Sequence, residues 1–162
     1  MIRPSLLLFC CVLAGCAARP DTRTIWPVGA AAPQGETERI FVATTRETAP
    51  VPADGFTSVR SPQPHFAEFV VSIPPNHVPG EIEWPEGPTD PQTDFAVASH
   101  KRLDGKAFIR GVNAASPNGA GVFVHGYNYN FPEALFRTAQ MAADAQISDA
   151  PVLFSWPSAA TP

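Results

Sequence analysis

The chain has 162 residues, a formal net charge of -4, and 44% hydrophobic residues. This length suits one domain of ordinary size, and the acidic balance gives no reason to expect attraction to nucleic acid or to anionic lipid. The three cysteines, Cys10, Cys11 and Cys16, all lie near the N-terminus. The rest of the chain therefore cannot form a disulfide, and its stability must come from packing.

The N-terminus has the pattern of a secretion signal. Arg3 precedes an apolar stretch at residues 6–13, which ends in Leu13-Ala14-Gly15-Cys16. This ending resembles the lipobox of bacterial lipoprotein precursors, which implies cleavage before Cys16 and acylation of that cysteine. The apolar stretch is shorter than the roughly 20 residues of a membrane-spanning helix. We expect a signal peptide at residues 1–15 and lipid on Cys16, with plain secretion or an uncleaved anchor as alternatives. The expected location is the cell envelope, on the outer membrane facing the periplasm.

The next segment and the first half of the domain differ in composition. Residues 16–36 are small, polar and proline-containing, which predicts a flexible tether. From residue 37 onward, stretches rich in β-branched and aromatic residues predict strands at 39–45, 66–73, 95–99 and 107–110. Asp104-Gly105 predicts a hairpin turn before the last of them. The first half is therefore expected to be antiparallel.

The second half has the pattern of a β-α-β unit. Residues 121–124 and 152–156 are short apolar runs, and a helix of about 16 residues is predicted between them. Asn130 is a suitable N-cap, Pro132 suits the first turn, and Glu133 can reach back to the cap. Parallel strands joined in this way are normally buried within a sheet.

Three motifs carry a family resemblance: VFVHGYNYNFPEAL at 122–135, PVLFSWPS at 151–158, and VSIPPNHVPGEIEWP at 71–85. They resemble a bacterial family of α/β-hydrolases of unknown function, related to esterases and lipases. The resemblance implies an α/β class and a partial α/β-hydrolase fold over residues 37–162. Members of that family continue into a Gly/His-x-Ser-x-Gly elbow, an acid and a histidine. We therefore expect a truncated domain that lacks its C-terminal half and leaves the strand before His125 with an open edge.

The turn after that strand is the predicted site. A strand that ends in His125-Gly126 can direct successive amides to one point, as an anionic tetrahedral intermediate requires. We predict that the amides of Tyr127 and Asn128 form an oxyanion hole, that Gly126 allows close approach, and that His125 orders the turn. An ordinary strand-to-helix loop is the alternative, and a general-base role for His125 is another possible reading.

No catalytic triad is found in this sequence. No serine lies in Gly-x-Ser-x-Gly; Ser155 is the most suggestive, but it lies inside a predicted apolar strand, and no histidine follows His125. His65, His77 and His100 have no metal-ligand spacing, so neither a metal nor another cofactor is expected.

These patterns predict the N-terminal part of a lipid-anchored serine esterase or lipase-like hydrolase that is inactive alone. Whether the chain is an enzyme stays open. An ester or amide would be its substrate only with the missing half supplied, and its other expected partner is the membrane. The alternatives are a non-catalytic envelope lipoprotein whose partner covers the open strand edge, and a degenerate gene product.

Overall fold

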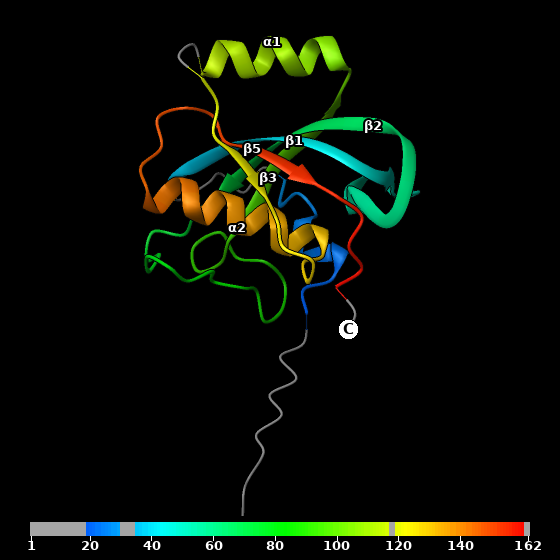
Figure 1. The fold of residues 1–162 in the computed structure, drawn as a ribbon. Helices are drawn as coiled ribbons and strands as arrows, with labels where there is room; N and C mark the ends of the chain where they lie inside the picture. The colour runs from blue at the N-terminus through cyan, green and yellow to red at the C-terminus, as the bar shows by residue number, and fades with distance from the viewer. Residues whose placement is uncertain (1–18, 30–34, 117–118, 161–162) are drawn as a thin grey trace, which may run out of the picture.

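The computed structural model describes residues 19–29, 35–116 and 119–160. Five strands form one mixed sheet in the order β3-β2-β1-β5-β4, with α1 and α2 on opposite faces (Figure 1). The strands are β1 Thr37–Thr48, β2 Phe56–Ser72, β3 Ala96–Leu103, β4 Val122–Val124 and β5 Val152–Ser155. The helices are α1 Gly105–Ala115 and α2 Phe131–Asp144, with short 3-10 helices η1 Thr22–Ile25 and η2 Pro52–Asp54. The predicted α/β class is confirmed.

The first three strands are antiparallel, as expected. β1 pairs with β2 from Thr37↔Ser72 to Thr44↔His65, and β2 pairs with β3. Side chains along β1 alternate between faces, so that Ile40 and Val42 join the main core while Phe41 packs on the α1 side. Two register shifts on either side of Arg46 bend the end of β1.

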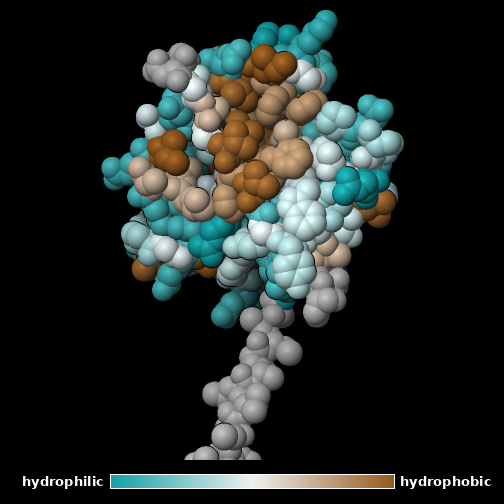
Figure 2. Space-filling model, viewed as in Figure 1, coloured by the Kyte–Doolittle hydropathy of each residue, from teal (hydrophilic) through white to brown (hydrophobic). Residues whose placement is uncertain are grey.

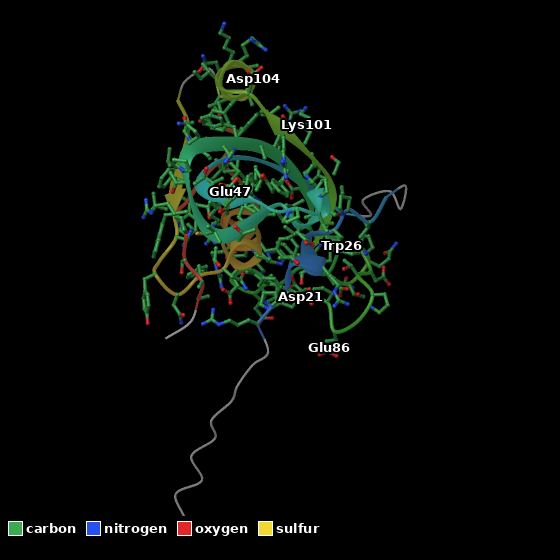
Figure 3. The ribbon with its side chains drawn as sticks, turned by 90° about the vertical axis from the view of Figure 1, so that its right-hand side faces the viewer. Asp21, Trp26, Glu47, Glu86, Lys101 and Asp104 are labelled. Carbon is green, nitrogen blue, oxygen red and sulfur yellow. The ribbon has the colours of Figure 1, made fainter. Side chains whose placement is uncertain are left out.

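The prediction of a strand at 107–110 is wrong, because these residues lie in α1. Asp104, predicted to make a hairpin turn, is instead the N-cap of this helix, and its Oδ1 accepts a hydrogen bond from the Ala107 amide at 2.7 Å. An Asp before Gly satisfies either structure, since its carboxylate can bond a turn amide or a helix amide. The helical spacing of Phe108, Val112 and Ala115, which pack beside Phe41, decides between them. Figure 3 shows Asp104 where α1 begins, at the edge of the domain.

The predicted β-α-β unit is confirmed. β4 and β5 are parallel neighbours, and β5 is also parallel to β1. Asn130 and Glu133 form a capping box at the start of α2: the Asn130 side chain accepts from the Glu133 amide, and the Glu133 carboxylate accepts from the Asn130 amide. α2 has 14 residues and places Leu135 and Phe136, both fully buried, in the main core.

The tether prediction is wrong for residues 19–28, which pack against the domain. Ile25 is fully buried in the main core, and the Val28 amide donates to the Val97 carbonyl at 3.0 Å. Arg19 forms an ion pair with Glu133 at 2.9 Å. Asp21 and Trp26 mark the segment in Figure 3. Its mostly polar, proline-containing composition led to the tether prediction, but Ile25 anchors the segment in the core. The predicted signal peptide and Cys16 lie outside the described residues.

β4 forms one edge of the sheet and, within the described part of the chain, pairs with β5 alone. Val122 and Val124 are 61% and 56% exposed. An apolar groove between β4 and α2 is lined by residues that include Phe123, Met141 and Ile147. Figure 2 shows the apolar side chains gathered on this side of the molecule. None of the helices in the described ranges is long and apolar enough to span a bilayer.

Candidate functional site

The predicted turn lies where two parallel strands end together. Val124 is paired with Phe154, so the turn that follows β4 lies beside the loop that follows β5. Residues 126–128 are exposed. Beside them is a groove lined by Ile82, Trp84, Asn128, Tyr129, Glu133 and Arg137. The turn therefore borders a concave surface rather than a flat one.

Side chains hold the carbonyl groups of this turn. Each carbonyl from residue 125 to residue 129 accepts a hydrogen bond from a side chain of another element or of the turn itself. The pairs are His125 O with Trp156 Nε1 at 2.9 Å, Gly126 O with His125 Nδ1 at 2.8 Å, Tyr127 O with Ser158 Oγ, Asn128 O with Arg19 Nη1 at 3.1 Å, and Tyr129 O with Arg46 Nη2 at 3.3 Å. The backbone of the turn is thus fixed at every peptide.

The amides of the turn point the other way. In a trans peptide the N–H is directed opposite to the carbonyl of the same peptide unit, and the described residues contain no cis peptide bond. The Tyr127 amide therefore points away from the His125 ring, and the Asn128 amide points away from Ser158. No hydrogen bond between described residues uses either amide as donor. Both amides belong to exposed residues.

His125 is a buried, neutral part of the support beneath the turn. It is 3% exposed, and its ring stacks on Trp156 with the centroids 5.3 Å apart. Burial lowers the pKa of His125, the charge of Arg46 lowers it further, and the contact with the Gly126 carbonyl offsets part of the change. Its Nε2 lies 3.1 Å from Ser155 Oγ. Both ring nitrogens are thus hydrogen-bonded inside the protein.

The Ser155–His125 contact has the atoms of a serine–histidine dyad but not its accessibility. Ser155 is 0% exposed within β5, and its Oγ also accepts a hydrogen bond from Arg46 Nε at 2.8 Å. A nucleophile must reach the substrate carbonyl carbon, and this hydroxyl faces only protein. Ser155 is therefore a packed hydroxyl, as its place in an apolar strand indicated.

Sequence reasoning missed Arg46, which is the largest polar side chain in the interior. It is 1% exposed and, besides Ser155, donates to the carbonyls of Ser158 at 2.9 Å, Thr57 at 3.2 Å and Tyr129. Burial lowers its pKa to about 10, so that it is still charged at neutral pH. No carboxylate within the described residues forms an ion pair with it. The alternation of inward-facing residues along β1 placed position 46 on the same face as Ile40 and Val42, and this signal could have revealed it.

The other histidines lie elsewhere. His77 bridges two carboxylates, with Nδ1 2.8 Å from Glu83 and Nε2 2.9 Å from Asp144. His65 contacts Ser61, and His100 stacks on Phe69. In the described part of the chain, no group of three or more potential ligands could hold a metal ion.

Comparison with known protein families gives a match in the second half of the chain. Residues 105–161 match a family described as alpha/beta hydrolase of unknown function (DUF900). The match covers α1, the β-α-β unit and the turn, but not β1 to β3. No curated protein and no solved structure matches the chain significantly. The segment that carries the candidate site is therefore similar to α/β-hydrolases, in agreement with the fold.

Proposed function

We propose that the domain forms the oxyanion side of a serine esterase or lipase-like hydrolase. In such an enzyme a serine attacks the carbonyl carbon of an ester or amide, the alcohol or amine leaves, and water then releases the acyl group. The negative charge that develops on the carbonyl oxygen is stabilised by preorganised N–H donors. The amides of Tyr127 and Asn128 suit this role because the carbonyl of each of the two peptides accepts a hydrogen bond from a side chain, while neither N–H group has a partner among the described residues. This observation carries the proposal.

The nucleophile, acid and base would come from a further polypeptide segment. The 162 residues contain no Gly-x-Ser-x-Gly, and among the described residues only β5 pairs with β4. The carboxyl ends of parallel strands meet at the same side of a sheet, so a strand added parallel to β4 would end beside the turn. A serine at that end would face the carbonyl carbon whose oxygen contacts the two amides. The chain by itself is therefore expected to have no esterase activity.

The proposed lipid anchor would place this site close to a membrane. Arg19 contacts the turn through Asn128 O and α2 through Glu133. Only two residues lie between Cys16 and Arg19, and the three residue-to-residue steps that join them span at most about 11 Å. Lipid on Cys16, in the outer membrane facing the periplasm, would therefore hold the turn near the bilayer surface. Labelling with a palmitate analogue tests the anchor, with Cys16→Ser expected to abolish it.

The decisive experiment begins with the nucleotide sequence beyond codon 162, read in all three frames. A strand followed by Gly/His-x-Ser-x-Gly is expected, and coexpression of that segment should restore hydrolysis of a p-nitrophenyl ester. Tyr127→Pro removes one amide donor and should lower kcat by about 10²–10³. Tyr127→Ala keeps the amide and is the matched control. If the purified chain alone hydrolysed the ester and a serine-directed phosphonate abolished this activity, the prediction that the chain is inactive by itself would be refuted.

A non-catalytic binding role is the second candidate, and the open edge of β4 with exposed Val122 and Val124 favours it. It predicts a domain that melts cooperatively and a partner that covers this edge, without any downstream nucleophile segment. A degenerate gene product, by contrast, would aggregate or be degraded and would show no cooperative transition.

A further inference from the structure

Arg46, Ser155, His125 and Gly126 form a series of hydrogen bonds beneath the turn, in which each group donates to the next. A guanidinium can only donate, so Arg46 Nε gives its hydrogen to Ser155 Oγ at 2.8 Å. At the other end of the series, the Gly126 carbonyl can only accept, so His125 Nδ1 must carry a hydrogen to bond it at 2.8 Å. A neutral imidazole has one N–H. His125 Nε2 is therefore unprotonated and accepts the Ser155 hydroxyl hydrogen across 3.1 Å.

We propose that Arg46 is a positioning residue for the amide turn, acting through the Ser155 hydroxyl to keep the His125 proton on Nδ1, where it fixes the Gly126–Tyr127 peptide. This inference rests on the proposed role of the Tyr127 and Asn128 amides. With the proton on Nε2 instead, Nδ1 would present a lone pair to the Gly126 carbonyl, and the repulsion would turn the peptide. The Tyr127 N–H belongs to that peptide, so its direction depends on the tautomer.

The same guanidinium also supports the second amide. Arg46 Nη1 donates to the Ser158 carbonyl at 2.9 Å, and the Ser158 hydroxyl donates to the Tyr127 carbonyl. The Tyr127–Asn128 peptide carries the Asn128 N–H. A peptide whose carbonyl accepts a hydrogen bond is polarised, which makes its N–H a stronger donor. Both predicted oxyanion donors are therefore connected to one buried side chain.

The experiment measures the tautomer directly. In the purified ¹⁵N-labelled protein, long-range ¹H–¹⁵N spectra of His125 should show a neutral ring protonated at Nδ1 at neutral pH. Arg46→Met removes the cation that directs the Ser155 hydroxyl hydrogen toward Nε2, so the hydroxyl can rotate and accept from Nε2–H. The Nε2–H form should then appear, and the Tyr127 amide proton should shift toward its random-coil position. Arg46→Lys keeps a charged donor and should restore the Nδ1–H form in whole or in part.

Two further variants separate positioning from general support. Ser155→Ala leaves the bonds from Arg46 to the carbonyls in place but removes the acceptor that an Nε2–H would need. The Nδ1–H form should therefore persist in Ser155→Ala, and adding Ser155→Ala to Arg46→Met should suppress the Nε2–H form. Thr138→Ala removes a buried hydroxyl bonded to Ala134 O in α2 and should lower the melting temperature without changing the His125 signals. If Arg46→Met does not fold, Arg46→Gln decides, because its neutral amide lacks the charge that orients the Ser155 hydroxyl.

The inference is overturned if the wild-type ring carries its proton on Nε2. It is equally overturned if the tautomer and the Tyr127 amide shift stay unchanged in Arg46→Met, or in Arg46→Gln where Arg46→Met does not fold. Neither result bears on whether a downstream segment restores hydrolysis. Conversely, a protein that never hydrolyses esters but has the expected tautomer changes would refute the hydrolase proposal and leave the role of Arg46 in ordering the turn intact.

Discussion

The two faces of the sheet are covered very differently. α2 contributes nine buried residues and packs against a core that includes Ile40, Phe69 and Leu153. α1 has its apolar residues on one side as well, yet none of its residues is buried, and Ile109 is 58% exposed. An amphipathic pattern thus predicts that a helix lies on a sheet, but not how completely the surrounding elements enclose it.

This difference determines the surroundings of β4. Phe123 packs against the core on the α2 side, so Val122 and Val124 point to the α1 side. α1 lies over Phe41 and Val152 and leaves both valines exposed. The open edge and the open face therefore meet at the strand that leads into the candidate site.

The largest expected effect comes from the core beneath α2. Leu135→Ala removes a fully buried side chain and should lower the free energy of unfolding by about 2–5 kcal/mol. Ile109→Ala in α1 should change it by less than about 0.5 kcal/mol. Urea unfolding measures both. Equal losses from the two substitutions would contradict the contrast between the faces.

The two N-caps give a smaller effect. Asn130→Ala breaks the capping box of α2 and should cost about 1 kcal/mol in global unfolding. Asp104→Ala breaks the single cap bond of α1. Because α1 is peripheral, we expect faster hydrogen exchange confined to its first turn, with little change in the global transition. A global loss from Asp104→Ala as large as that from Asn130→Ala would indicate that α1 belongs to the cooperative core.

The C-terminal end of α2 should make stability depend on pH. Burial lowers the pKa of His77, but its hydrogen bonds to Glu83 and Asp144 outweigh this and raise it above 6.5. The stabilisation is therefore complete below about pH 6.5 and is lost as pH rises through the raised pKa. For Glu83 and Asp144 burial raises the pKa, but hydrogen bonds lower it overall, so their contribution is lost as pH falls below about 4.5 and 3.8.

His77→Gln tests this dependence in unfolding experiments between pH 5 and pH 9. Glu38, whose pKa is raised to about 7 by burial and by Glu36, gives both proteins a slope of the same sign, since it also releases its proton more readily when unfolded. The difference between wild type and variant isolates His77. A difference that does not shrink as pH rises above 6.5 would contradict the predicted sign.

The smallest effect on stability is expected at the open edge. Val122→Lys places a charge on an exposed edge strand, so the free energy of unfolding should hardly change, while self-association should decrease. Val59→Lys is the matched control, because Val59 in β2 is also 61% exposed. Sedimentation velocity of the two variants and the wild type measures association. An equal decrease in both variants would mean that added charge, not the β4 edge, is responsible.

Local signals predicted much of the fold. The alternation in β1 and the apolar runs of β4 and β5 specified strands, and Asn130 with Glu133 specified the start of α2, because each depends on residues a few positions apart. The sequence failed where one local pattern fits two structures. Asp104-Gly105 suits a turn and a helix cap equally. The segment around Ile25 has only a few apolar residues, and of these Trp26 is 44% exposed while Ile25 is fully buried in the core.

The sequence by itself located the candidate turn, because His125-Gly126 after an apolar strand is a local pattern. Backbone amides are present there whatever the side chains are. Only the tertiary structure decided what holds that turn. Arg46 and Ser155 are 109 residues apart, and Ser158 and Arg19 reach the turn from opposite ends of the chain. Their hydrogen bonds require strand pairing and burial to bring them together, because water would otherwise satisfy each group separately.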